Sequence, residues 1–549
     1  MEIVVVLLGV KEWDINATDT LGQTALVWAV IRGHKEVVSI LLQRKDLNLS
    51  TPNTKYGRTP LWLAVERGYS AIVKSLLERE DINLNAPDTK YGRTPLLTAV
   101  MGEHEGVVGL LLQRKDLNPN TPDTKYGQTP LQWAAERGYE GIVRLLLKRE
   151  DINSNTPDAK SGRTPLLTAV LGEHEGEVRL LLQRKDLNPN TLDTEYGQTP
   201  LRRAVQCGYE GTVRLLLERE DTDPNTPGRK CGQTPLLAAA IGGHEGVVGL
   251  LLQRKDLNPN TPDTEYGQTP LQCAALRGYE RIVRLLLERQ DTDLNAPGRK
   301  CGQTPLLAAA IGGHEGVVGL LLQRKDLNPN IPDTEYGQTP LLCAALRGYG
   351  GIVRLLLERG DTDPNTLDTE RGRTPLLAAA AGRHEGVVRL LLQRKDVDPN
   401  TPDTEYGRTP LWWAAWRGYE GIVRLLLERE DTNPNTPDIK SSRTPLSYAA
   451  IYGHEGIVKF LLQRKDLDPN IPDLHGKTAL ELATFRGHAG VVRLLSEHKP
   501  SPPTPTNTQN AENTGQKTLP QGNISNSNKR ATPPTDEGTP SKKPRASLT

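Results

Sequence analysis

Apolar residues along the chain fall into short blocks separated by polar runs, always in the same order. Thr234 and Pro235 open one apolar block, and a pair of glycines closes it. A second block, 245–252, carries its apolar residues at i, i+1, i+4 and i+5, on one helical face. Thr is a good N-cap, Pro suits the first helical position, and Gly ends helices. A run of Asn, Pro, Asp and Gly then breaks the pattern, so the segment predicts helix, turn, helix and loop.

This unit recurs along almost the whole chain. Thr-Pro occurs at a constant spacing of 35 residues, at Thr59, Thr94, Thr129, Thr164, Thr199, Thr234, Thr269, Thr304, Thr339, Thr374, Thr409 and Thr444. Thr-Ala versions at Thr24 and Thr478 bring the anchored units to fourteen. A period of 70 residues lies over the first, because 227–260 is repeated letter for letter at 297–330. Neither helix can bury its apolar side alone, so the pattern predicts a stack of repeats, a solenoid.

Three motifs of the unit resemble those of the ankyrin repeat family over roughly residues 20–497. They read G-[QR]-T-P-L-x-x-A-[AV], then G-[HY]-x-x-x-V-x-x-L-L, then D-x-[ND]-x-N. The resemblance implies an all-α ankyrin-repeat solenoid whose β-hairpin-like fingers project from one edge. It also implies that partners meet the concave face, made by finger tips and first helices. The family's His after T-P-L is missing, and Trp62, Gln132 and Arg202 are among its replacements, so its hydrogen bonding is expected to be absent.

The repeat pattern divides the chain into three parts. Residues 1–19 match the second helix and loop of a unit, and 20–498 form an array of about fourteen repeats. The apolar start is either a half-repeat cap or the continuation of a longer protein. Residues 499–549 are rich in Pro, Thr and Asn without apolar periodicity, so we expect a disordered tail.

Basic residues in the tail resemble a bipartite nuclear localisation signal. They form two clusters separated by eleven residues: Lys529 and Arg530, then Lys542, Lys543 and Arg545. Such clusters on an extended segment predict an importin-type receptor as one partner. Thr539 precedes Pro540 in a context that resembles a cyclin-dependent kinase site. Phosphate there would add negative charge beside the second cluster, and we expect it to weaken nuclear import.

Charge and cysteine content narrow the class of protein. Residues 1–499 carry a net charge of −2 and the rest +3, which gives no electrostatic argument for nucleic acid or an anionic membrane. The first apolar run is too short to cross a membrane and lacks the basic start of a signal peptide. The odd number of cysteines predicts reduced thiols in an intracellular protein, cytoplasmic or nuclear: Cys207, Cys231, Cys273, Cys301 and Cys343.

The motifs that could indicate catalysis or cofactor binding each lack a required residue. The His-Glu pairs lack the second His of a zinc site, because Val248 and its equivalents stand four residues on. The Asp-rich loop from Asp221 fails the calcium pattern, since its sixth and twelfth positions are Thr226 and Gly232. There is no P-loop, and every nucleophile or base recurs as part of the repeat. The sequence therefore predicts a non-enzymatic protein without metal or cofactor.

Variation between the repeats indicates where a partner would bind. The unit 411–419 carries three of the seven tryptophans, Trp412, Trp413 and Trp416, where other units place smaller residues. Trp and Arg dominate binding hot spots. Trp412, Trp413 and Trp416 are therefore candidate partner-binding residues, and Trp62, Trp133, Arg202 and Arg203 are weaker ones. The alternative is that the rings fill the core between repeats, which is favoured for Trp413. A row of Arg after the first helix, including Arg417, could attract an acidic partner, although nearby Glu favours a solvated face.

Together these features predict a protein-binding scaffold or adaptor that uses its concave ankyrin surface. The alternative is the C-terminal ligand-sensing region of a larger NACHT-type nucleotide-binding receptor, whose catalytic domain would lie upstream. Direct nucleic-acid binding depends on the tail alone and is the weakest of the three hypotheses. The sequence does not predict the partner or the oligomeric state.

Overall fold

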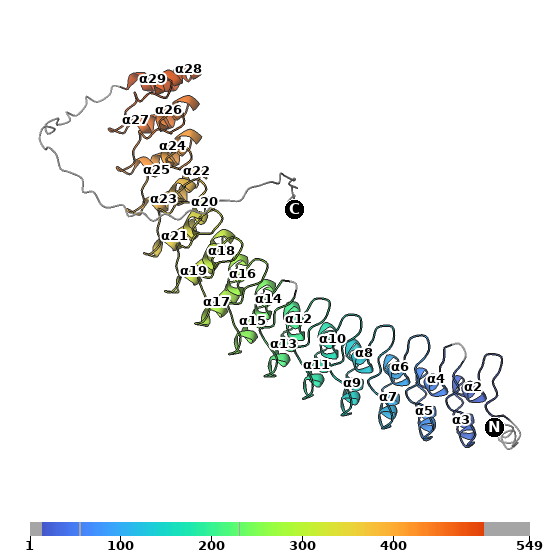
Figure 1. Cartoon of the computed structure of the whole chain (residues 1–549). Coiled ribbons are helices and arrows are strands. Elements are labelled where there is room, and N and C mark those ends of the chain that lie inside the picture. The colour runs from blue at the N-terminus through green and yellow to red at the C-terminus, as the bar shows by residue number, and fades with distance from the viewer. Residues whose placement is uncertain (1–13, 54–55, 230, 499–549) are drawn as a thin grey trace, which may run out of the picture. The chain divides into compact units, whose positions relative to one another are not determined.

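The computed structural model describes residues 14–53, 56–229 and 231–498, and its regular elements within these ranges are all helices (Figure 1). The first helices of the repeats are α2 (Ala25–Ile31), α4 (Pro60–Glu66), α6 (Pro95–Met101), α8 (Pro130–Arg137), α10 (Pro165–Leu171), α12 (Pro200–Cys207), α14 (Pro235–Gly242), α16 (Pro270–Arg277), α18 (Pro305–Gly312), α20 (Pro340–Arg347), α22 (Pro375–Ala381), α24 (Pro410–Arg417), α26 (Pro445–Tyr452) and α28 (Ala479–Arg486). The second helices are α3 (Lys35–Leu41), α5 (Ser70–Leu77), α7 (Glu105–Leu112), α9 (Glu140–Leu147), α11 (Glu175–Leu182), α13 (Glu210–Leu217), α15 (Glu245–Leu252), α17 (Glu280–Glu288), α19 (Glu315–Leu322), α21 (Gly350–Glu358), α23 (Glu385–Leu392), α25 (Glu420–Leu427), α27 (Glu455–Leu462) and α29 (Ala489–Glu497). The predicted all-α solenoid is confirmed.

Several predictions concern residues outside these ranges. The N-terminal half-repeat lies mostly in 1–13, and the whole tail lies in 499–549. The basic clusters (Lys529, Arg530, Lys542, Lys543 and Arg545) and Thr539 therefore fall outside the described residues and stay predictions.

The helices begin where the sequence pattern places them. Each first helix follows a Thr whose side chain accepts a hydrogen bond from the backbone N–H three residues on, as Thr234 does from Leu237. The side chain of Gln132 in turn accepts a hydrogen bond from the backbone N–H of its N-cap, Thr129, and this completes a capping box. The expected loss of hydrogen bonding at the family's His position is wrong in part. Trp62 donates to the carbonyl of Arg93, and Gln132 donates to that of Arg163, in the next finger.

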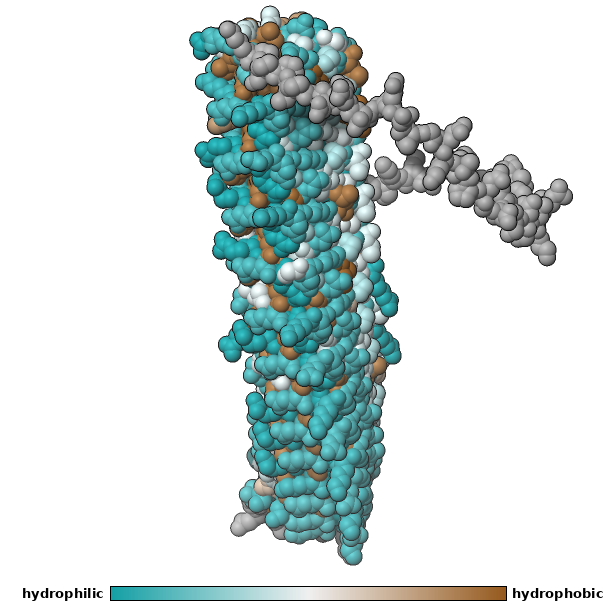
Figure 2. Space-filling model, turned by 90° about the vertical axis from the view of Figure 1, so that its left-hand side faces the viewer, coloured by the Kyte–Doolittle hydropathy of each residue, from teal (hydrophilic) through white to brown (hydrophobic). Residues whose placement is uncertain are grey.

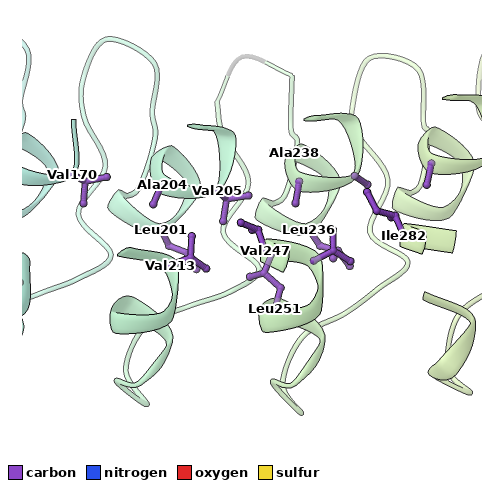
Figure 3. Close-up of a cluster of buried hydrophobic side chains, with 14 of the residues drawn as sticks. Val170, Leu201, Ala204, Val205, Val213, Leu236, Ala238, Val247, Leu251 and Ile282 are labelled. Carbon is purple, nitrogen blue, oxygen red and sulfur yellow. The ribbon is translucent and has the colours of Figure 1, made fainter. Parts of the chain in front are cut away.

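The repeats stack as two layers of helices. First helices contact first helices of the neighbouring repeats, second helices contact second helices, and the two helices of a repeat contact each other. Figure 3 shows Val205, Val213, Leu236 and Val247 in the space between the layers, where all four are fully buried. Each such side chain stabilises the fold by about 1.5–3 kcal/mol relative to an exposed one. The core therefore runs along the stack.

The fingers between repeats lie along one edge of the row (Figure 1). In most fingers a buried Asp orders the turn, as Asp88 does by accepting the backbone N–H groups of Tyr91 and Arg93. Neighbouring fingers are joined through the backbone, since Thr124 N donates to Tyr91 O at 2.8 Å. Gly92 has a φ of +65°, and a side chain there would collide with Thr124. The fingers thus form a continuous border beside the first helices.

An arginine ladder ties each repeat to the preceding one. Arg254 donates to both carboxylate oxygens of Asp256, at 2.9 and 2.7 Å, and also to the carbonyls of Leu217 and Arg219 at 3.3 and 3.2 Å. A cation at these orphan carbonyls also complements the dipole of α13. The same Arg-Asp pair recurs every 35 residues, at Arg44, Arg79, Arg114, Arg149, Arg184, Arg219, Arg254, Arg289, Arg324, Arg359, Arg394, Arg429 and Arg464. An asparagine ladder runs beside it: Asn260 donates to Asp291 O and accepts from Asp293 N.

The arginine ladder predicts a loss of stability in acid. The paired guanidinium lowers the pKa of each ladder aspartate below its ordinary value, to about 2 for Asp46. A carboxyl with a lowered folded-state pKa stabilises the fold fully above its unfolded value, and that contribution disappears as the pH falls through the folded value. We expect the urea midpoint to fall steeply only between about pH 4 and about pH 2. Equal midpoints at pH 2 and pH 7 would contradict this.

Three repeats hold a charged residue where others have glycine after the first helix. Glu103, Glu173 and Arg383 adopt φ of 56°, 59° and 63°, whereas the sibling position in the copied unit is Gly243, with φ of 74°. The left-handed conformation costs a residue with a side chain about 1–2 kcal/mol. We therefore expect Glu173→Gly to raise the free energy of unfolding by about 1 kcal/mol, measured by urea denaturation. The reverse change, Gly243→Glu, is the matched control and should destabilise; an opposite pair of signs would refute the strain.

Candidate partner-binding surface

Five aromatic side chains gather on the first helices of three successive repeats, and we call them the aromatic surface. They are Trp413 and Trp416 of α24, Tyr448 and Tyr452 of α26, and Phe485 of α28. Phe485 is 74% exposed and Tyr452 is 51% exposed, while the other three are half-buried. The helices that carry them are neighbours in the stack, because α24 contacts α26 and α26 contacts α28.

Trp412 lies beneath the aromatic surface and joins its parts. Its ring centroid is 4.5 Å from that of Tyr448, 5.5 Å from that of Trp416 and 5.7 Å from that of Trp413. The rings of Trp413 and Trp416 are 5.2 Å apart, and Tyr448 stacks on Tyr452 at 6.4 Å. Aromatic pairs of this kind contribute about 0.5–1.5 kcal/mol beyond their buried area. The cluster therefore bridges two repeats and holds the outer rings in defined positions.

The tryptophan that fills the core is Trp412, which corrects its expected place on the binding surface; Trp413 is half-buried. Trp412 is 1% exposed, because the third residue after the capping Thr faces the next repeat. Trp413, one position further, lies at the edge of the helix layer and donates its indole N–H to Asp403 Oδ2 at 3.3 Å. Trp416 is half-buried, so part of its ring is accessible for contact with a partner.

The indole N–H of Trp412 is a buried donor without an acceptor among the described residues. Trp62 occupies the same position in its repeat, and its Nε1 donates to Arg93 O at 2.9 Å. Tyr448 packs edge-on against Trp412, whereas the smaller Thr98 occupies the equivalent position beside Trp62. An unpaired buried donor costs about 1–3 kcal/mol, which offsets part of the stabilisation that burial of the Trp412 ring provides.

Basic side chains surround the aromatic surface. The guanidinium carbon of Arg408 lies 3.9 Å from the ring centroid of Tyr406, 4.5 Å from that of Trp412 and 5.3 Å from that of Trp413. Arg417 lies over Trp416 at 4.4 Å, and Lys477 lies over Phe485 at 4.8 Å. Lys440 lies over the ring of Tyr406 at 5.7 Å. Each cation is attracted to the face of a ring, and the arrangement orients the charges beside the apolar groups.

The remaining sequence candidates lie elsewhere. Trp62 and Arg202 are only 2% and 6% exposed, because both side chains donate to a finger carbonyl of the next repeat. They serve packing between repeats, which corrects their expected place on the surface. Burial lowers the pKa of the Arg202 guanidinium. Arg203 is half-buried, and Trp133 lines a cavity of about 530 Å³ with Arg137, Lys160 and Arg163.

Sequence reasoning missed most members of the aromatic surface. Tyr448, Tyr452 and Phe485 stand at helix positions where the other repeats mostly carry non-aromatic residues. Aligning the repeats on their Thr anchors shows that Tyr448 is at the same helix position as Trp413 and that Phe485 is at the same position as Trp416. Counting tryptophans alone hid this, because the surface is built from three types of aromatic residue.

The other surfaces of the described repeats provide weaker evidence for a binding or reactive site. On the face that Figure 2 shows, apolar residues form small areas separated by polar ones. None of the helices described here is long and apolar enough to cross a membrane. Within the same ranges no group of His, Cys, Asp and Glu has the geometry of a metal site. Burial raises the pKa of the Cys273 and Cys343 thiols to about 12, so neither thiol provides a nucleophilic thiolate near neutral pH.

Comparison with known proteins places the chain in a family. The sequence profile described as ankyrin repeats (3 copies) matches it seven times in succession, at residues 1–88, 81–158, 151–227, 220–298, 289–368, 360–438 and 430–506. The chain therefore belongs to the ankyrin repeat family, whose members serve as protein-interaction modules. Among solved structures it is similar to the crystal structure of the ankyrin repeat domain of Bcl-3, a unique member of the IkappaB protein family, with 28% identity and a TM-score of 0.38. That alignment covers 42% of this chain and 100% of the other. No curated protein matched.

Proposed function

We propose that this protein is a non-enzymatic scaffold whose partner binds the aromatic surface. The observation that carries the proposal is the concentration of accessible rings on α24, α26 and α28. Rigid aromatic side chains next to Arg are typical of binding hot spots. Here Trp412 contacts Trp413, Trp416 and Tyr448, so these three rings need little ordering when a partner arrives, which favours affinity.

The position of the surface also supports this function. It combines first helices with the adjoining fingers, through Asp403, which bonds Trp413, and Arg408, which packs on Tyr406. Partners of ankyrin repeats are expected on this part of the fold.

The experiment that tests the proposal compares two tryptophan variants of the full chain as bait in an extract of the source cells. Trp413→Ala with Trp416→Ala should reduce recovery of the specific partners at least about tenfold, as expected for loss of hot-spot residues. Trp28→Ala is the matched control, because Trp28 is an exposed tryptophan at the same helix position as Trp413, in the first repeat. Equal recovery by wild type and the double variant would refute this binding site.

A further inference from the structure

The cations around the aromatic surface lack carboxylate partners. Within the described ranges, Arg408, Arg417, Lys440 and Lys477 form no ion pair, although ion pairs are frequent elsewhere in the array. Arg417, Lys440 and Lys477 are exposed, and the Nε of the half-buried Arg408 has no hydrogen-bond partner. Three of these cations, Arg408, Arg417 and Lys477, lie on rings of the aromatic surface. The fourth, Lys440, lies on the ring of Tyr406 in the adjoining finger.

The acidic residues nearby are bound within their own fingers and caps. Asp403 accepts from Tyr406 N and the Trp413 indole, and Asp438 accepts from the backbone and hydroxyl of Ser441. Asp473, in the next finger, accepts hydrogen bonds from the backbone of Lys477 and from the side chain of Arg443. Glu481 completes the capping box of α28, and Glu405 lies within 3.8 Å of Arg371. Three of these five carboxylates, those of the aspartates, are at least 95% buried. The groups that this surface presents to a partner are therefore mostly apolar rings and cations; of the five carboxylates, only those of Glu405 and Glu481 are exposed.

We infer that the partner, at the surface given in the proposed function, is a protein segment in which acidic residues alternate with apolar ones. Apolar side chains of such a segment would pack against Trp413, Trp416 and Phe485. Its carboxylates would pair with Arg417, Lys440 and the other cations, which the rings hold in place. Complementary charge at an interface rim sets specificity and association rate, and its effect weakens as salt screens it.

Rings interleaved with basic groups can also bind single-stranded nucleic acid, but the charges here favour protein. Nucleic-acid grooves need cations that follow the phosphate backbone continuously. The four cations here border a compact cluster, and Glu370, Glu405 and Glu420 interrupt any longer positive path. An acidic peptide needs only a few such contacts beside the rings.

The test measures binding of labelled synthetic probes to the full chain by fluorescence anisotropy. One probe is a short peptide of Glu, Asp, Leu and Phe, the second replaces its acids by Gln and Asn, and the third is a single-stranded oligothymidine. We expect the acidic peptide to bind best and to weaken as salt rises. Arg417→Glu with Lys440→Glu should reduce its affinity about tenfold or more. Arg347→Glu, at the position of Arg417 on α20, is the matched control and should leave the affinity unchanged.

Other outcomes separate this inference from the proposed function. If the neutral peptide binds equally well and the charge reversals have no effect, the inference that the partner segment is acidic is wrong, and the aromatic surface remains the proposed site. Preferential binding of the oligonucleotide would overturn this inference as well. Failure of every peptide to bind, while partner recovery from extract still depends on Trp413 and Trp416, would also overturn the acidic chemistry. Recovery that is independent of these tryptophans would instead refute the proposed function.

Discussion

Replacing Arg254 with leucine is expected to lower the free energy of unfolding by about 3 kcal/mol. The substitution removes both hydrogen bonds to Asp256 and four to backbone carbonyls of the preceding repeat, those of Leu217, Arg219, Glu220 and Thr222. Carbonyls at the end of α13 then lose their charged donor. Because each repeat is stabilised mainly by its neighbours, weakening one interface should split the array into two cooperative parts.

Urea denaturation followed by circular dichroism measures this effect. The wild-type transition should be replaced by a broader or two-step curve with an earlier onset. Lys255→Ala is the control, because Lys255 is exposed and lies next to Arg254 in the chain. A midpoint and slope equal to those of wild type would show that the arginine ladder contributes little.

Trp412 and Trp416 are expected to separate stability from binding within one cluster. Trp412→Ala removes a ring that is 1% exposed and contacts Trp413, Trp416 and Tyr448, so it should cost about 3–5 kcal/mol. Trp416→Ala removes a half-buried ring and should cost about 1 kcal/mol, while it weakens partner binding. Thermal unfolding and partner recovery, measured on both variants, check the two effects.

The reverse result would contradict this division. If Trp416→Ala destabilised the array as much as Trp412→Ala, the outer rings would be core residues. If Trp416→Ala left partner recovery at the wild-type value, the aromatic surface would serve packing alone. Trp412→Phe is the matched conservative variant: it keeps an apolar ring, removes the unpaired indole N–H and should cost less than Trp412→Ala.

The fold could be predicted from the sequence because the same local signals occur in every repeat. Thr234 caps its helix, Pro235 occupies the first turn, and a glycine such as Gly243 adopts the left-handed conformation at the helix end. These signals act within a few residues and need no knowledge of the neighbours. The period of 35 residues then determines that repeats stack in register.

Interactions between repeats were harder to predict. The charged run after each second helix, such as residues 253–256, is visible in the sequence, but the sequence does not show that Arg254 reaches the carbonyls of Leu217 and Arg219. Which of two adjacent tryptophans is buried depends on a difference of about 100° around the helix. Trp412 faces Tyr448 of the next repeat, and the position of that ring follows only from the stacked structure.

Site-specific photocrosslinking in the source cells tests the central claim most directly. A photoreactive phenylalanine analogue replaces Trp416 in one variant and Trp28 in the other. We expect irradiation to yield a discrete protein adduct from position 416 and no adduct of the same mass from position 28. The adduct should disappear when Arg417 and Lys440 are both replaced by Glu. Adducts of equal yield at both positions, or at position 28 alone, would show that the aromatic surface is not where the partner binds.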